Sequence, residues 1–454
     1  MTPFRLALVA ASGVLALAAS GPEPVDRARQ WPSWRGPLGT GVAPHADPPI
    51  EWSEESNIRW KRPLPGVGHS TPVVWDDRIF LTTAVPVGES SAAVAPPSIG
   101  AHDNVAPSRT LEFVVLALSR ADGSVLWRRT VRRERPHEST HSTGSWASSS
   151  AVTDGEHLLV SFGSRGVYGL DLDGDLLWER DLGDMRIKHG HGEASSPALH
   201  GDTLVLNWDH EGDSFLAALD KRSGELRWQI ARQEGTSWST PIVVEADGKP
   251  QVIVSATGRV RGYALTTGEL IWECAGLSGN VVASPVAADG VVYVANSYET
   301  RAMLAIRFAG ASGDLTATDA VLWRRDRDTP YVPSPLLYGD ELYFLKHYQG
   351  LLTAVRAETG ESLYGPSRLP GVRNVYASPV GAGGRIYITG REGATLVLRS
   401  GAVPEVLAVN RLDDSFSASP VPVGRELYLR GRESLYSISS DPVQPSIAGE
   451  KPGL

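Results

Sequence analysis

Residues 196–230 read SPALHGDTLVLNWDHEGDSFLAALDKRSGELRWQI. The stretch opens with Ser-Pro and closes with an aromatic residue placed four positions after a glycine, at Gly224 and Trp228. Between these two marks lie short runs that are rich in apolar and β-branched residues and are separated by turn-forming residues, which is the pattern of consecutive strands. We expect the strands within 196–200, 203–208, 215–220 and 225–230. Four antiparallel strands joined by short turns form one sheet, such as a propeller blade.

The unit is repeated along the chain. Its opening phrase recurs at Ser70-Thr71-Pro72, Ser196-Pro197, Thr240-Pro241, Ser284-Pro285, Ser334-Pro335, Ser378-Pro379 and Ser419-Pro420, with a degenerate copy at Ser149-Ser150-Ala151. From the degenerate copy onward the spacing is about 41–50 residues. Self-similarity at such a period is typical of repeat architectures built from one small unit. The sequence therefore predicts an all-β protein: an eight-bladed β-propeller with four antiparallel strands per blade.

The last copy is incomplete, because only three strand-like runs follow Ser419. A run of the missing type precedes the first copy, at residues 57–63, and it resembles the fourth-strand run at 125–129. We expect this N-terminal strand to pair into the last blade and close the ring, which removes exposed strand edges. The glycine–aromatic ending recurs at Gly123/Trp127, Gly174/Trp178, Gly224/Trp228, Gly268/Trp272 and Gly360/Tyr364. We interpret these aromatic side chains as wedges between neighbouring blades.

The remaining segments flank the repeats. Residues 1–20 combine Arg5 with an apolar stretch and small residues, which predicts a cleaved signal peptide and an exported protein in the periplasm or outside the cell. The alternative is a retained N-terminal anchor; no other stretch is apolar enough to span a bilayer. Residues 21–50 form a Pro/Gly-rich leader whose Trp31 and Trp34 indicate packing on the propeller. The propeller is assigned to 51–440, with an insertion at 85–109, and 441–454 to a disordered tail.

Composition excludes some classes of function. A formal net charge of -9 argues against a nucleic-acid partner. The single cysteine, Cys274, cannot form an intrachain disulfide, and we interpret it as a small buried hydrophobe. We expect a monomer.

The Ser-Pro opening, the Gly-x-x-x-Trp ending and the period resemble the repeat of the pyrroloquinoline-quinone-type (PQQ-like) β-propeller family. The phrases Trp34-Arg35-Gly36-Pro37 and His69-Ser70-Thr71-Pro72-Val73-Val74 are similar to those of exported bacterial members without an assigned activity. The resemblance also implies distant kinship with quinoprotein alcohol dehydrogenases and with the propeller lipoprotein of outer-membrane assembly. It covers roughly residues 31–440 and points to a fold more than to an activity.

In such a propeller, the connections between blades and the loops between second and third strands share one face around the central channel. We expect binding there, because loops on a rigid scaffold carry most binding residues. The candidate ligand-face residues are Arg165, Arg259, Lys346, Arg391, Arg432, Tyr298 and Trp238. Arginines at these positions suit the carboxylate or phosphate of a small anionic or polar ligand, or an envelope protein.

Two other interpretations of this face stay open. Imidazole and carboxylate groups suit zinc, copper or iron, and a metal site is conceivable from His137, His141, His189, His191, Asp209, His210 and Glu211. Alternatively, the same side chains are solvated or pair with carboxylates of the neighbouring blade.

The resemblance implies an enzyme only if the sequence contains the groups that quinoprotein dehydrogenases use to bind and position their cofactor. Those dehydrogenases hold the quinone against calcium, stack it on a disulfide of adjacent cysteines and use an aspartate base. Cys274 alone cannot make that disulfide, and the sequence contains neither a recognisable calcium loop nor a haem-attachment motif. We therefore predict a non-catalytic, exported binding or scaffold protein with no cofactor and no catalytic residue. The alternative is an atypical PQQ-dependent oxidoreductase, with calcium, that lacks the disulfide.

Overall fold

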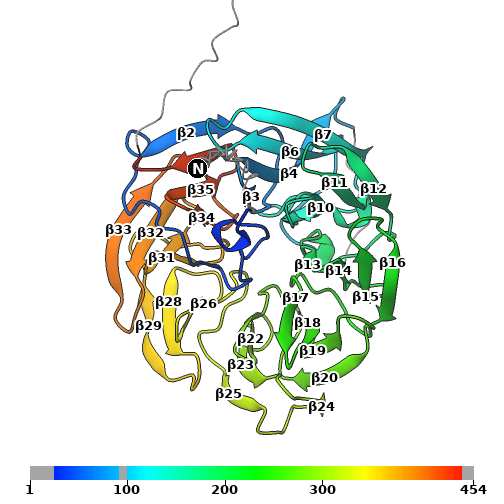
Figure 1. The fold of residues 1–454 in the computed structure, drawn as a ribbon, viewed down its shortest axis with the longest axis vertical. Coiled ribbons are helices and arrows are strands. Elements are labelled where there is room, and N and C mark those ends of the chain that lie inside the picture. The colour runs from blue at the N-terminus through cyan, green and yellow to red at the C-terminus, as the bar shows by residue number, and fades with distance from the viewer. Residues whose placement is uncertain (1–24, 92–99, 442–454) are drawn as a thin grey trace, which may run out of the picture.

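The computed structural model describes residues 25–91 and 100–441. These residues form eight small β-sheets arranged radially around one axis, so the predicted eight-bladed propeller is confirmed (Figure 1). The predicted signal peptide (1–20) lies outside the described residues, as do residues 92–99 of the insertion and the predicted tail from residue 442 onward.

Each blade is a four-stranded antiparallel sheet whose first strand lies nearest the axis. Blade 1 consists of β3 (Val73–Trp75), β4 (Arg78–Val87), β6 (Thr110–Ser119) and β7 (Val125–Glu134). Blade 2 consists of β9 (Val152–Thr153), β10 (His157–Ser161), β11 (Val167–Asp171) and β12 (Leu176–Arg180). Blade 3 consists of β13 (Ala198–His200), β14 (Thr203–Trp208), β15 (Phe215–Asp220) and β16 (Leu226–Ala231). Blade 4 consists of β17 (Ile242–Ala246), β18 (Lys249–Ser255), β19 (Arg259–Ala264) and β20 (Leu270–Ala275), with β24 (Gly313–Asp314) added at its outer edge.

The second half of the ring repeats the pattern. Blade 5 consists of β21 (Val286–Ala288), β22 (Val291–Asn296), β23 (Ala302–Arg307) and β25 (Val321–Arg325). Blade 6 consists of β26 (Leu336–Tyr338), β27 (Glu341–Leu345), β28 (Leu351–Arg356) and β29 (Ser362–Arg368). Blade 7 consists of β30 (Val380–Ala382), β31 (Arg385–Thr389), β32 (Ala394–Arg399) and β33 (Glu405–Arg411). Blade 8 consists of β34 (Val421–Val423), β35 (Glu426–Arg430), β36 (Ser434–Ile438) and β2 (Ile58–Pro63).

The repeated hydroxyl residues form a closed ring of hydrogen bonds around the axis. In each blade the hydroxyl oxygen accepts the backbone N–H of the corresponding residue in the preceding blade, at 2.8–3.2 Å. The order of the ring is Thr71, Ser150, Ser196, Thr240, Ser284, Ser334, Ser378, Ser419 and again Thr71. We call these eight residues the hydroxyl ring. The degenerate copy keeps its place because Ser150 retains the hydroxyl, although Ala151 replaces the proline.

Indole side chains join the blades at their outer strands. At the seam between blades 8 and 1, the Trp60 indole N–H donates to the Arg120 carbonyl at 3.1 Å, and a Cβ on Gly123 would lie 2.6 Å from the Trp60 ring. Glycine is required there because its backbone φ is +69° and a side chain would displace the indole. The same arrangement pairs Trp127 with Gly174, Trp178 with Gly224, Trp228 with Gly268 and Trp323 with Gly360. The Trp272 indole instead donates to Gln251 within blade 4.

The ring is closed by β2, the strand from the beginning of the chain. It pairs antiparallel with β36, with Trp60 opposite Ser437 and Lys61 opposite Tyr436. Across the same seam, Arg430 of β35 is fully buried and donates to the carbonyls of Ser70 (2.9 Å) and Thr82 (2.8 Å). Burial lowers the pKa of Arg430 to about 9, so the guanidinium is charged at neutral pH.

The leader packs across one end of the ring. Its backbone at Trp31 exchanges two hydrogen bonds with Val74, and β1 (Val42–Ala43) pairs with β30. The buried Arg35 donates to the carbonyls of Thr40, Pro335 and Pro379 at 2.9–3.1 Å. The leader also contains a short 3-10 helix, η1 (Arg27–Arg29), which precedes these contacts in the chain. Within residues 25–91 and 100–441, no helix has the length and apolar character needed to cross a membrane.

The hydroxyl ring predicts a measurable contribution to stability. Replacing Ser284→Ala leaves the buried Thr240 N–H without its acceptor, and an unpaired buried donor costs about 1–3 kcal/mol. Ser239→Ala is a matched control, because the Ser239 hydroxyl is equally buried, adjacent to the ring, and has no hydrogen-bond partner among the described residues. Urea denaturation should show a lower midpoint for Ser284→Ala and little change for Ser239→Ala. Equal losses in the two variants would contradict a role for the ring.

Candidate functional site

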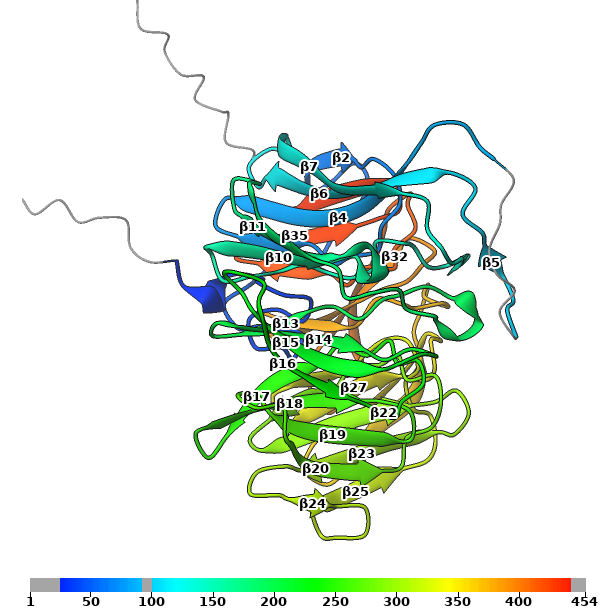
Figure 2. The same cartoon turned by 90° about the vertical axis from the view of Figure 1, so that its right-hand side faces the viewer.

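The propeller has one covered end and one open end. The leader lies across one end of the axis, and the connections between blades and the insertion lie at the other (Figure 2). Between them is an axial cavity of about 530 Å³, whose lining includes Trp34 of the leader. Since Trp34 also lines the groove between the leader and the inner strands, it forms the floor of the axial cavity.

The wall of the axial cavity follows a simple rule in the sequence. Successive side chains of an extended segment alternate between two faces, so the residue two positions before each ring hydroxyl points the same way as the hydroxyl. All eight residues at that position line the cavity: His69, Ser148, Ala194, Trp238, Val282, Val332, Tyr376 and Ser417. Each blade therefore contributes to the cavity wall the side chain that its sequence carries at this one repeat position.

An arc of aromatic rings in contact covers blades 5 to 7 of the wall. Ring centroids are separated by 5.2 Å for Tyr298 and Tyr331, 4.8 Å for Tyr331 and His347, and 4.4 Å for His347 and Tyr348. Tyr376 continues the arc at 5.7 Å from Tyr348. Burial raises the pKa of Tyr331 above its usual range and lowers that of His347. Both shifts favour the uncharged forms of the Tyr331 phenol and the His347 imidazole, so the arc offers an apolar face with polar edges.

Arg391 ends the arc and differs from the other predicted cations. Its guanidinium lies over the Tyr376 ring, 4.7 Å from the centroid, and lines the axial cavity. Its Nε is buried and has no hydrogen-bond partner among the described residues, and no described carboxylate lies within ion-pair distance of it. The Arg391 charge is therefore available to a ligand.

Most of the other cationic candidates are neutralised outside the axial cavity. Arg259 pairs with Glu273 (3.0 Å) and Asp314 (3.2 Å), and Lys346 pairs with Asp328 (3.0 Å). Arg432 is largely exposed and lies 3.8 Å from Glu433. Of the seven predicted ligand-face residues, the structure brings Trp238, Tyr298 and Arg391 to the axial cavity and places the other four elsewhere.

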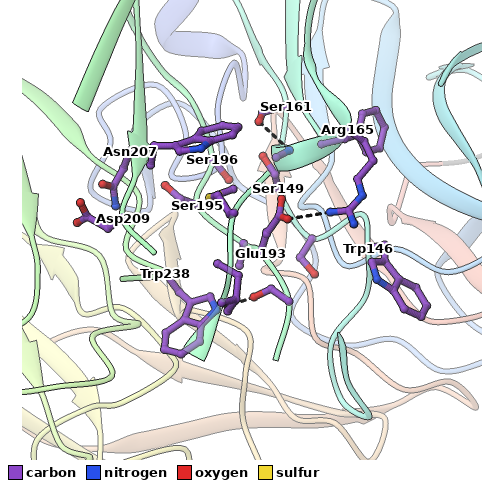
Figure 3. Close-up of a pocket in the computed structure, with 18 of the residues that line it drawn as sticks. Trp146, Ser149, Ser161, Arg165, Glu193, Ser195, Ser196, Asn207, Asp209 and Trp238 are labelled. Carbon is purple, nitrogen blue, oxygen red and sulfur yellow. Dashed lines mark hydrogen bonds and ion pairs between the residues drawn. The ribbon is translucent and has the colours of Figure 1, made fainter. Parts of the chain in front are cut away.

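Arg165 lines a small cavity between blades 2 and 3 (Figure 3). It donates to the Glu193 carboxylate at 2.8 Å, and the same carboxylate accepts the Ser164 N–H at 2.7 Å. This cavity measures about 30 Å³, which is enough for about one or two water molecules. Arg165 is therefore a structural residue of the blade interface, held by Glu193.

Four histidines gather at the open end of the axial cavity: His102, His141, His189 and His191, which we call the histidine cluster. The His191 ring centroid lies 4.8 Å from those of both His102 and His141, and 5.3 Å from that of His189. Burial and the neighbouring imidazoles lower the pKa of His191 to about 4, and burial lowers that of His141. His102 comes from the insertion, His141 from β8 (Thr140–His141), and the other two from the connection that contains η3 (Lys188–Gly190).

The other predicted metal ligands do not join the cluster. Asp209 is buried against Arg232 with two contacts of 2.7 and 3.0 Å. His137 Nδ1 faces Arg165 at 3.0 Å, and its Nε2 faces the Met185 carbonyl at 2.8 Å. His210 accepts the Arg186 N–H at 3.0 Å, and the Glu211 carboxylate accepts the Thr236 N–H at 2.9 Å. These four side chains therefore hold loops in place, and of the seven candidate ligands only His141, His189 and His191 lie in the histidine cluster.

Sequence reasoning missed several residues of the site. His102 was not predicted, because nothing in the repeat places an insertion relative to the ring. Tyr331, Tyr348, Tyr376 and Trp34 were also missed. Tyr376 could have been found from the repeat, because it lies two residues before the Ser378 hydroxyl. The predicted residue Trp238 occupies the same position before Thr240 in blade 4.

The Asp209–Arg232 pair yields a test of its structural role. Asp209→Asn leaves the buried Arg232 guanidinium without its counter-charge, and breaking such a pair costs about 3–5 kcal/mol. The double variant Asp209→Leu with Arg232→Met removes both charges and should recover much of that loss. Urea denaturation of the two variants measures the difference. A double variant that is no more stable than Asp209→Asn would contradict this account.

Comparisons with known proteins agree with the geometry. A family model described as outer membrane protein assembly factor BamB matches residues 50–206, 111–363 and 212–441. Among solved structures, the chain is similar to BamB from Moraxella catarrhalis, with 14% identity and a TM-score of 0.50 over 78% of this chain and 100% of that chain. It is similar to the computationally designed protein Ika8, with 12% identity and a TM-score of 0.51 over 78% of this chain and 97% of that one.

A third similar structure is the quinohemoprotein alcohol dehydrogenase ADHIIG from Pseudomonas putida HK5, with 11% identity and a TM-score of 0.54 over 94% of this chain and 82% of that one. No curated protein sequence matches the chain significantly. At such identities the structural similarities establish the fold alone, whereas the family model covers most of the chain. The family model, together with the ring of repeats, shows that the chain belongs to the PQQ-like propeller family described as outer membrane protein assembly factor BamB.

Proposed function

We propose that this protein is an exported, non-catalytic binding protein whose axial cavity takes a small, planar, anionic ligand. The observation that carries the proposal is Arg391: a guanidinium without a carboxylate partner among the described residues, stacked on Tyr376 and facing a cavity of about 530 Å³. A pocket of this size, lined by aromatic residues with a few polar groups, is typical of small-molecule sites.

The walls suggest the shape and charge of the ligand. The tyrosine arc and Trp34 offer flat surfaces on which a planar molecule can stack. Arginine binds carboxylates through paired, charge-assisted hydrogen bonds. Asn374 also lines the cavity, and its side-chain oxygen has no partner among the described residues, so it can accept a hydrogen bond from the ligand. A planar aromatic carboxylate satisfies these groups together.

The alternative of a calcium–quinone enzyme fits the cavity less well. Calcium takes six to eight oxygen ligands, usually including carboxylates. Of the described residues that line the axial cavity, Asp103 alone carries a carboxylate, and it lies 3.6 Å from His102. Cys274, the only cysteine of the chain, is buried in β20 and provides no disulfide for stacking. The donor set supports binding of a planar anion better than it supports binding of calcium.

Export and a protein partner belong to the same proposal. The signal-like residues 1–20 and the family support a location in the periplasm or outside the cell. Because the family model is described as an assembly factor, an envelope protein is the alternative occupant of the open end. Such a partner would present an acidic group to Arg391 in place of a free carboxylate.

Binding of planar carboxylates tests the proposal. Calorimetric titration should detect binding of at least one of benzoate, terephthalate and calcium-free pyrroloquinoline quinone. Arg391→Gln should weaken that binding about 10- to 100-fold, because a hydrogen bond to a charged group contributes about 1.5–3 kcal/mol. Arg259→Gln is the matched control, since Arg259 begins the third strand of its blade and pairs with Glu273 outside the cavity.

The outcomes separate the alternatives. Unchanged binding by Arg391→Gln, or no binding of any of the three probes, would contradict the proposed ligand class. Reduction of a dye by alcohols or sugars, after loading with pyrroloquinoline quinone and calcium, would overturn the non-catalytic assignment. Recovery of an envelope protein that depends on Arg391, without binding of the small probes, would replace the small ligand with a protein partner.

A further inference from the structure

We infer that His102, His141 and His191 form a binding site for one divalent transition-metal ion, of the zinc or copper class, at the open end of the axial cavity. Their candidate ligand nitrogens all lie within 4.8 Å of one another. Ligand nitrogens about 2.0–2.1 Å from a tetrahedral ion are separated by about 3.3 Å. Binding of the ion therefore requires the rings to rotate until the nitrogens are closer, and His102 is the exposed ring of the three. The site does not depend on the proposed ligand.

The three histidines are positioned by backbone contacts between segments far apart in the sequence. β5 (Asn104–Val105) of the insertion pairs with β8, with Asn104 opposite His141. The Asn104 side chain donates to the carbonyls of His189 (2.7 Å) and Gly190 (3.1 Å). The His141 N–H donates to the His191 carbonyl at 3.0 Å. The insertion is thereby attached to two different blade connections at the place where the three imidazoles meet.

The hydrogen bonds of the individual rings fit ligation. His191 Nε2 is buried and has no hydrogen-bond partner among the described residues, which is uncommon for a buried polar atom. His141 Nδ1 lies 2.7 Å from the Thr143 hydroxyl. The Thr143 backbone N–H also donates to this Nδ1 at 3.2 Å, so Thr143 engages His141 through Nδ1, and Nε2 is the ring nitrogen left to face a metal. A metal ion would satisfy the His191 nitrogen that the protein leaves unpaired.

The nature of the donors selects the metal. Imidazole suits zinc, copper and nickel, whereas calcium and magnesium prefer oxygen ligands. Three protein ligands leave a fourth position of a tetrahedral ion for water or for a ligand. All three histidines line the axial cavity, so the fourth position opens toward it. The insertion therefore has a physical role, because it contributes the third imidazole.

The test uses the full chain, stripped of metal with a chelator and titrated with Co²⁺, Zn²⁺ or Ca²⁺. We expect one Co²⁺ per chain, with the visible absorption bands of a four-coordinate ion, displaced by one equivalent of Zn²⁺ and unaffected by Ca²⁺. His102→Gln should weaken Zn²⁺ binding more than about 100-fold, since loss of a neighbour of a ligand already costs 10- to 100-fold. His102 is exposed, so the substitution leaves the core intact.

Control variants complete the experiment. His200→Gln removes a histidine of β13 that pairs with Glu245 away from the cluster, and it should bind Zn²⁺ as the parent chain does. His191→Gln should lose binding together with His102→Gln, and circular dichroism should show both variants folded. No saturable binding by the parent chain, binding unchanged by His102→Gln, or displacement of Co²⁺ by Ca²⁺ would each overturn the inference. The metal titrations contain no planar carboxylate. Their result therefore stands even if none of the carboxylates binds to the axial cavity.

Discussion

A hydroxyl before each inner strand accepts a backbone N–H from the preceding blade, and eight such bonds run unbroken around the axis. Each bond satisfies a donor that would otherwise be buried and unpaired, which is costly in a protein interior. Because the residue before a proline is held in an extended conformation, the Ser/Thr-Pro phrase presents the hydroxyl in the same way in seven blades. The ring also fixes which neighbouring side chains face the axial cavity.

Closure of the ring depends on the two ends of the propeller segment meeting. β2 supplies the fourth strand of blade 8, and its Trp60 packs on Gly123 of blade 1. Arg120 of blade 1 donates to Glu426 at 2.7 Å and to the Tyr428 hydroxyl at 3.0 Å, so polar contacts join the same two blades. The leader, which precedes β2 in the chain, lies across the end of the axis, where Arg35 attaches it to blades 6 and 7.

Much of the fold was predictable because the repeated residues are the same ones that make the contacts between blades. Ser150 without a proline and β2 from the chain's beginning were both assigned correctly, since the hydroxyl spacing and the Trp60 run identify them. The candidate site was less predictable. Arg391 and Arg259 both lie where the second strand of a blade leads into the third, and only the positions of Glu273 and Asp314 in space decide which charge stays free. His102 could not be placed, because its position depends on the Asn104 contacts of an insertion that no period describes.

Amide hydrogen exchange of the hydroxyl ring tests the central claim most directly. If the eight bonds form one closed and cooperative ring, the Ser419 amide, which donates to Thr71 across the seam, should exchange as slowly as that of Thr240 on the far side, and only through global unfolding. Fast exchange of the Ser419 amide through local opening, while the Thr240 amide stays protected, would show that the ring is open at the seam and would contradict the account.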